Sequence, residues 1–112
     1  MTKEEALKKI DSEVKSNKIV IYMKGNADFP RCGFSSQAVE VVRRLGYPFK
    51  AFDVLEDPVL WEYLEDYSGW PTFPQVFIGG KLVGGCDIVT EMFEKGELQE
   101  LAKSVCEGAE KK

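Results

Sequence analysis

Cys32 is the residue of this chain best placed to do chemistry. It lies in the run Arg31-Cys32-Gly33-Phe34-Ser35, between an apolar run typical of a strand and an amphipathic run typical of a helix. A helix N-terminus offers unpaired N–H groups and a partial positive charge, which favour the thiolate, the form that attacks disulfides and binds metals. Serine stands where a two-cysteine redox site would have its second thiol. Ser35 can donate a hydrogen bond to the Cys32 sulfur but cannot form a disulfide with it, so the sulfur must pair with a group from outside this motif.

Neighbouring residues favour the same reactivity. Lys24 follows the predicted strand and is placed to approach the sulfur, and Arg31 directly precedes it. Gly33 lets another molecule's backbone or sulfur come close without a side-chain clash. The alternative is that Cys32 is only a small buried hydrophobic residue. The order strand, loop, cysteine and helix favours the reactive thiol.

The composition excludes several other functions. The chain has 112 residues, with 15 basic and 19 acidic side chains, a net charge of −4 and no basic stripe, so we expect no nucleic acid partner. It has no histidine, which excludes histidine acid–base catalysis and any histidine-containing metal site. Three widely spaced cysteines, Cys32, Cys86 and Cys106, fit a reducing compartment better than a disulfide framework. No run is long enough to span a membrane and no secretory signal is visible. We expect a cytoplasmic protein, or one of an organelle matrix if a transit peptide has been removed.

The elements that position Cys32 follow from hydrophobic period and turn residues. The first half is expected to contain a helix capped by Thr2 and Glu5, a strand at Ile19–Met23, a helix from Cys32–Gly33 to Gly46, and a strand at 49–54. A helix capped by Asp57 and ending by Ser68–Gly69 follows, and then a proline loop at 70–74. The last elements are a hairpin of strands 75–78 and 81–83, a helix capped by Asp87, and a short helix through Leu98, Leu101 and Val105. The helix between the first two strands implies a parallel pair with a right-handed crossover. The sequence therefore predicts one α/β domain over 1–112, a thioredoxin-like three-layer fold whose small mixed sheet, a parallel pair plus an antiparallel hairpin, is flanked by helices. Its core is expected at about 3–105, with a polar tail at 106–112.

Four sequence blocks resemble the CGFS-type monothiol glutaredoxins. They occur in that family's order and spacing, and the similarity runs from about Lys3 to Val105. The blocks are Met23-Lys24-Gly25, Cys32-Gly33-Phe34-Ser35, Trp70-Pro71-Thr72-Phe73-Pro74-Gln75 and Gly84-Gly85-Cys86-Asp87-Ile88.

The resemblance implies a glutathione site that can hold a [2Fe–2S] cluster between two protomers. Cys32 would supply one ligand from each protomer and bound glutathione the others, with BolA-type proteins and recipients of Fe–S clusters as partners. A cis bond before Pro74 would expose the backbone of Phe73 to glutathione, and the helix start at Gly85–Asp87 would hold its γ-glutamyl end. The residues implied to bind the cofactors are Lys24, Cys32, Gly33, Phe34, Thr72, Phe73, Pro74, Gly85, Cys86 and Asp87, with Cys32 also the reactive and metal-ligating residue.

Several alternatives stay open at this level. The protein could instead be a monothiol oxidoreductase that removes glutathione from proteins, at most a weak enzyme, or a binding module regulated by its cysteine. Asp87 could be an ordinary helix cap, Cys86 could form a disulfide with Cys32 or be a buried spectator, and we interpret Cys106 as incidental. Trp61 and Glu65 stand where the family commonly carries basic residues, so glutathione binds more weakly here or a differently charged thiol is used. For Trp61 itself we favour a role in helix packing over contact with a ligand.

Overall fold

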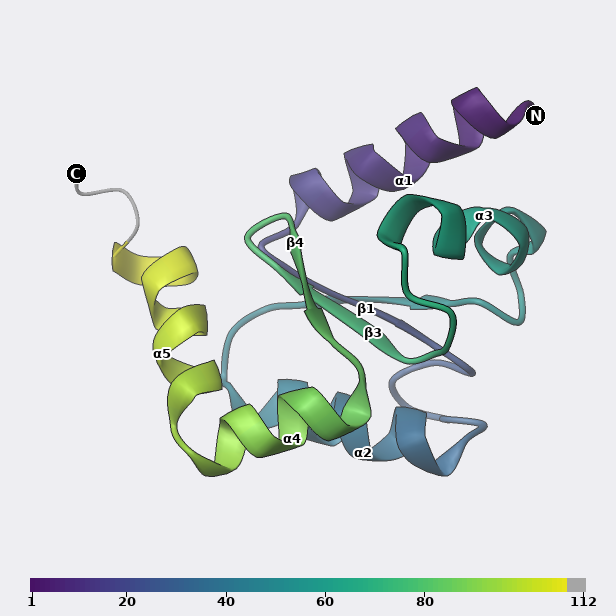
Figure 1. Ribbon diagram of the computed structural model, residues 1–112. Coiled ribbons are helices and arrows are strands. Elements are labelled where there is room, and N and C mark those ends of the chain that lie inside the picture. The colour runs from purple at the N-terminus through teal and green to yellow at the C-terminus, as the bar shows by residue number, and fades with distance from the viewer. Residues whose placement is uncertain (109–112) are drawn as a thin grey trace.

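Two pairs of helices enclose a four-stranded sheet in the computed structural model, which describes residues 1–108 (Figure 1). Helices α1 (Lys3–Ser16) and α3 (Pro58–Ser68) cover one face of the sheet, while α2 (Gly33–Arg44) and α4 (Cys86–Glu94) cover the other. Helix α5 (Glu97–Lys103) and the π-helical turn η1 (Ser104–Gly108) follow α4. The predicted three-layer, thioredoxin-like α/β fold is confirmed.

The sheet has the order β2-β1-β3-β4. Strand β1 (Ile19–Met23) runs parallel to β2 (Lys50–Asp53) and antiparallel to β3 (Gln75–Ile78), and β3 forms the predicted hairpin with β4 (Lys81–Gly84). All five residues of β1 are buried, which explains why its sequence is an unbroken apolar run rather than an alternation. The strand that leads to Cys32 is therefore paired on both edges and covered on both faces.

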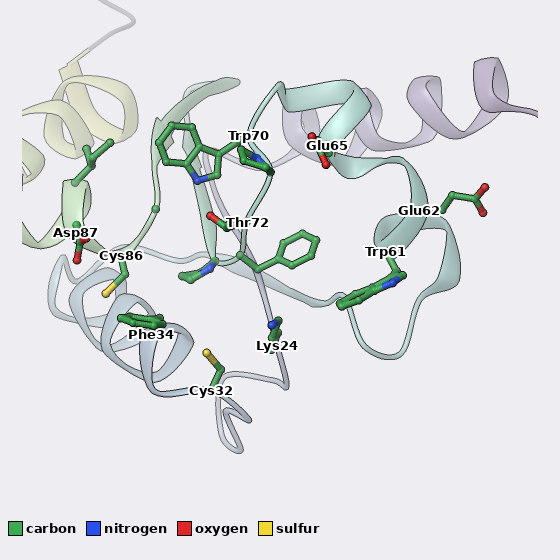
Figure 2. A pocket seen from close by; sticks show the side chains of 15 residues that line it. Lys24, Cys32, Phe34, Trp61, Glu62, Glu65, Trp70, Thr72, Cys86 and Asp87 are labelled. Carbon is green, nitrogen blue, oxygen red and sulfur yellow. The ribbon is translucent and has the colours of Figure 1, made fainter.

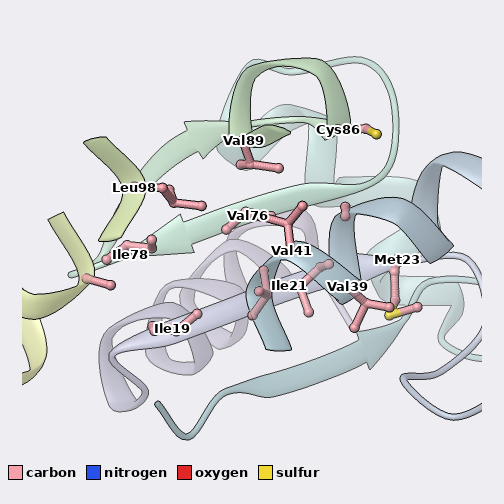
Figure 3. Close-up of a cluster of buried hydrophobic side chains, with 13 residues drawn as sticks. Ile19, Ile21, Met23, Val39, Val41, Val76, Ile78, Cys86, Val89 and Leu98 are labelled. Carbon is pink, nitrogen blue, oxygen red and sulfur yellow. The ribbon is translucent and has the colours of Figure 1, made fainter. Parts of the chain in front are cut away.

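Alternate residues of β1 and β3 belong to two separate apolar clusters. Ile19, Ile21 and Met23 pack with α2, α4 and α5 (Figure 3), while Val20 and Tyr22 pack with α1 and α3. This division follows from the two-residue period of a strand. Each helix pair is thus fixed to the sheet by its own apolar side chains.

Most of the predicted helix ends are confirmed. Thr2 and Glu5 form the expected reciprocal cap of α1, and the Asp57 side chain accepts a hydrogen bond from the Val59 N–H at the start of α3. Gly69, with a φ of 75°, ends α3 in the left-handed conformation that glycine adopts easily.

The prediction that Asp87 caps α4 is wrong. Gly85 is the N-cap, without a side-chain cap bond, and α4 begins at Cys86. Gly84 turns the chain with a φ of 152°, and a Cβ atom on it would lie 2.8 Å from Cβ of Ile88. The two glycines therefore let the helix start two residues earlier than predicted, and Asp87 lies in the first turn, where a negative charge suits the helix dipole.

The predicted polar tail at 106–112 begins inside the turn η1. Leu98 and Ala102 of α5 are buried, and Cys106 in η1 is half-buried and packs against the cluster around Ile21. The part of the predicted tail at 109–112 lies outside the described residues. Among the helices of residues 1–108, none is long and apolar enough to cross a membrane.

Candidate functional site

Cys32 faces a cavity of about 650 Å³ between the two helix layers (Figure 2). Four segments form its walls: the loop after β1 with the start of α2, helix α3, the loop before β3, and the start of α4. The cavity is lined by Lys24, Cys32, Phe34, Trp61, Glu62, Glu65, Trp70, Pro71, Thr72, Phe73, Pro74, Gly85, Cys86, Asp87 and Ile88. All predicted site residues except Gly33 thus meet at one cavity. Gly33 lies beside it as the first residue of α2, and a Cβ atom there would meet nothing within 4 Å.

The environment of Cys32 favours its thiolate. The backbone N–H of Ser35 makes the largest contribution to lowering the pKa of this thiol, and partial burial opposes it. The Phe34 N–H, the charge of Lys24 and the Ser35 hydroxyl lower the pKa further. These groups are the helix N-terminus and the cation that the sequence placed beside the sulfur, so the predicted electrostatic cause is present.

Ser35 connects the end of β1 to the reactive sulfur. Its side chain is fully buried, and its Oγ accepts a hydrogen bond of 3.0 Å from the backbone N–H of Lys24. The hydroxyl proton is then free to point at Cys32. Serine at this position therefore has a positive role, because it orients a donor toward the thiolate.

The buried side-chain amide of Gln75 holds the backbone of the loop before β3. Gln75 is fully buried, and its Nε2 donates to the carbonyl oxygens of Trp70 (2.9 Å) and Thr72 (3.1 Å). The Phe73–Pro74 bond is cis, as predicted. Thr72 is exposed at the cavity, whereas Pro74 is buried. Sequence reasoning placed Gln75 in the motif but missed this positioning role, which its polar side chain in an otherwise apolar strand could have signalled.

Close packing joins that loop to the start of α4. A Cβ atom on Gly85 would lie 3.2 Å from the carbonyl oxygen of Pro74 and 3.4 Å from Nε1 of Trp70. Any larger residue at Gly85 would push the two walls apart. The glycine therefore sets the spacing between the cis-proline loop and the α4 N-terminus.

Cys86 differs chemically from Cys32. It is buried, and desolvation is the largest cause that raises the pKa of its thiol, with the nearby charges of Asp87 and Cys32 acting in the same direction. Both cysteines are free thiols that line the same cavity (Figure 2). Cys32 is the better nucleophile and ligand of the two, and Cys86 is held as a neutral thiol.

The predicted packing role of Trp61 is wrong. Its side chain is 55% exposed and lies against the ring of Phe73, with 5.7 Å between the centroids. Helix α3 buries only Leu60 and Leu64, so the residue one step around the helix from Leu60 faces the cavity instead of the core. With Glu62 and Glu65 it forms what we call the α3 wall (Trp61, Glu62 and Glu65).

Sequence reasoning did not mention Glu62, and it gave no site role to three further lining residues of its own sequence blocks, Trp70, Pro71 and Ile88. The spacing of Glu62 and Glu65 on one side of a helix could have signalled Glu62. Ile88 follows Asp87 in the first turn of α4. No signal in the sequence alone distinguishes it from a core residue.

Among residues 1–108, no group of three or more histidine, cysteine, aspartate or glutamate side chains is arranged to bind a metal ion. Cys32 can supply a single thiolate. The arrangement therefore fits a site completed by other molecules.

The sequence matches the model of the Glutaredoxin family over residues 19–83. It is 50% identical over 101 residues to Glutaredoxin 4 of Pasteurella multocida, covering 90% of this chain and 93% of the relative. It is 48% identical over 98 residues to the chloroplastic monothiol glutaredoxin-S14 of Arabidopsis thaliana, covering 87% of this chain but only 57% of that longer relative.

Solved structures agree with this assignment. The solution structure of reduced poplar apo GrxS14 has a TM-score of 0.81 and 45% identity, covering 94% of this chain and 97% of that chain. A buckwheat glutaredoxin–glutathione complex has a TM-score of 0.80 and 29% identity, covering 92% of each chain. With one cysteine in the Cys32–Ser35 motif, at the cavity these elements build, the chain belongs to the glutaredoxin family as a monothiol member.

Proposed function

We propose that this protein carries a [2Fe–2S] cluster, bound in a homodimer by Cys32 of each protomer and by one glutathione per protomer. The observation that supports this most strongly is the state of Cys32. It is a partly exposed thiol with a lowered pKa at the cavity, and within the described residues it belongs to no group of three or more side chains that could bind a metal ion. The cluster is cargo that the dimer accepts and passes on.

The ligand count favours this proposal. A [2Fe–2S] cluster prefers four thiolates, and one available cysteine per chain gives two in a dimer. External thiols must provide the rest. Cys86, buried and with a raised thiol pKa, is a poor substitute.

Glutathione is the external thiol that the cavity of about 650 Å³ and the family suggest. A buckwheat glutaredoxin has been solved in complex with it. In this chain we assign the thiol end to Cys32, Gly33 and Phe34, and the peptide backbone of the ligand to Thr72, Phe73 and Pro74. The remaining assigned residues are Lys24, Gly85, Cys86 and Asp87. The free N–H groups at the start of α4 would bind the γ-glutamyl carboxylate.

An oxidoreductase is the second candidate, because a lowered thiol pKa also favours nucleophilic attack. The Cys32 thiolate would attack a protein–glutathione disulfide, forming a disulfide with glutathione and releasing the protein thiolate. A glutathione thiolate would then break that bond, giving glutathione disulfide and restoring Cys32. Ser35 cannot resolve the intermediate, so the second step depends on free glutathione.

Partners beyond glutathione follow from the same proposal. We propose BolA-type proteins, which would exchange the homodimer for a heterodimer, and Fe–S proteins that receive the cluster. A cytoplasmic location remains our prediction.

Anaerobic reconstitution with iron, sulfide and glutathione tests the proposal. We expect a coloured dimer with visible charge-transfer absorbance, and iron and sulfide in equal amounts. Cys32→Ser abolishes the absorbance and leaves a monomer, whereas Cys86→Ser and Cys106→Ser retain both signals. A colourless monomer with high activity in a glutathione-coupled disulfide assay would favour the oxidoreductase instead. Neither signal, together with tight binding of a partner protein, would favour a binding module.

A further inference from the structure

The cavity is strongly unbalanced in charge. Among its lining residues, Lys24 is the only cation, while Glu62, Glu65 and Asp87 are acidic, and the Cys32 thiolate adds a further negative charge. No carboxylate lies within ion-pair distance of the Lys24 ammonium among residues 1–108, and neither glutamate pairs with a cation of that range. A ligand would therefore meet one unpaired ammonium group and several unpaired carboxylates in the same cavity.

Figure 2 shows Cys32 and Cys86 on one side of the cavity and Trp61 and Glu65 on the other, with Lys24 between Cys32 and Trp61 and the Glu62 carboxylate turned outward at the rim. A thiol whose sulfur reaches Cys32 can extend one arm toward α4 and another toward the α3 wall. The residues of the α3 wall then act on the second arm alone.

Trp61 adds an aromatic surface to these carboxylates. Its ring is 55% exposed and packed on Phe73, so one face is supported while the rest remains available to a ligand. An ammonium group gains from the face of an indole ring and from nearby carboxylates. A carboxylate at the same place gains from neither and is repelled by Glu65, which leaves Lys24 as the one lining cation that favours it.

We propose that the thiol preferred by this cavity carries an ammonium group, in place of a carboxylate, on the arm that reaches the α3 wall. Its chemical class is a glutathione-like peptide thiol extended by an amine. This inference rests on the proposed thiol site at Cys32, and it assigns to Trp61 and Glu65 the selection among such thiols. Glu62 contributes through its charge at the rim.

Titrations with three matched probes test the inference. The probes are S-methylglutathione, its C-terminal amide, and its C-terminal conjugate with diaminobutane, whose arms end in a carboxylate, a neutral amide and an ammonium group. Amide NMR shifts of the whole reduced protein report each Kd, including weak ones. We expect the cationic probe to bind about tenfold more tightly than the acidic one, with the amide between them and the difference shrinking in high salt.

The Glu62→Gln/Glu65→Gln variant isolates the charges of the α3 wall. In this variant the Kd values of the three probes should become similar. The control is Glu94→Gln/Glu100→Gln, which makes the same charge change at exposed positions outside the cavity and should keep the tenfold difference between the cationic and the acidic probe. Equal or tighter binding of the acidic probe to the unmodified protein would overturn the inference while leaving the thiol site standing. No binding of any probe near Cys32 would overturn both.

Discussion

At the scale of single residues, the site separates two thiols by their surroundings. Cys32 lies at the start of α2, where N–H groups and Lys24 stabilise its thiolate, whereas burial keeps Cys86 protonated. The two side chains line one cavity, so the difference comes from a few neighbouring groups. Ser35 is the most informative of these, because it also bonds to the end of β1.

Ser35→Ala is expected to raise the pKa of the Cys32 thiol toward its ordinary value, because the hydroxyl donor to the thiolate is lost while the backbone donors remain. The measurement is thiolate ultraviolet absorbance against pH in a Cys86→Ser/Cys106→Ser background. Ser36→Ala, at an exposed neighbour, is the control. An unchanged titration would show that the Ser35 hydroxyl does not act on the sulfur.

The same pKa shift has a consequence for stability. A thiol pKa that is lower in the folded than in the unfolded chain stabilises the fold above the unfolded value, and this contribution is lost as the pH falls through the folded value. In Ser35→Ala this pH-dependent part becomes smaller.

At the scale of elements, side chains that link one segment to another hold the cavity walls in place. Gln75 of β3 holds the Trp70–Thr72 backbone, and the Tyr22 hydroxyl of β1 donates to Glu13 of α1 at 3.0 Å. Tyr67 of α3 likewise donates to Asp11 of α1 at 2.6 Å. These bonds fix the loop and the helix that face the ligand.

Gln75→Met keeps the volume of the side chain but removes two buried hydrogen bonds. We expect a loss of about 2 kcal/mol in the free energy of unfolding, because two carbonyls lose their donor, and weaker binding of glutathione, because the loop is released. Urea unfolding and thiol titration measure the two effects. Gln99→Met, which removes a similar bond to the Phe93 carbonyl away from the cavity, is expected to lower stability alone.

Tyr22→Phe tests the link between α1 and the sheet. Burial raises the pKa of Tyr22 well above the ordinary 10.0, so the fold excludes the tyrosinate. Its contribution is present below pH 10.0 and is lost as the pH rises further. At neutral pH the variant is therefore less stable than the unmodified protein by about 1–3 kcal/mol, because the donor to Glu13 is gone. At alkaline pH this difference becomes smaller, because the unmodified protein loses the contribution of Tyr22.

Urea unfolding at neutral and alkaline pH measures these changes. Tyr63→Phe is the control, because the Tyr63 hydroxyl makes no hydrogen bond within residues 1–108. A parallel loss of stability at both pH values would contradict the assignment to Tyr22.

Local patterns in the sequence predicted most of these elements, but not which of their side chains face the core and which face the cavity. The strands, the hairpin and the caps at Thr2 and Asp57 depend on neighbouring residues, and all were confirmed. Trp61 and Asp87 were assigned wrongly because their roles depend on tertiary context. Whether a helical tryptophan faces the core or a cavity depends on how much of α3 the sheet covers, and the cap of α4 depends on how Gly84 turns the chain.

At the scale of the whole molecule, the cavity is made of segments that are far apart in the sequence. Lys24 and Cys32 come from one end of the parallel pair, the α3 wall from the middle, and Gly85–Asp87 from beyond the hairpin. Two apolar clusters on opposite faces of the sheet hold these segments together. The sequence could name the blocks, but the order β2-β1-β3-β4 that brings them together was not deducible from spacing.

The central position of β1 also determines which parts of the molecule unfold locally and which only with the whole fold. Amides of Val20–Tyr22 are hydrogen-bonded between two strands and buried on both faces, so we expect hydrogen exchange there only through global unfolding. The amide of the exposed Thr72 should exchange through smaller local openings, which native-state exchange in low denaturant can separate. Similar protection at both places would contradict this order. The sulfur thus follows the most protected strand, while the proline loop at 70–74 on the opposite side of the ligand can open and release it with the fold intact.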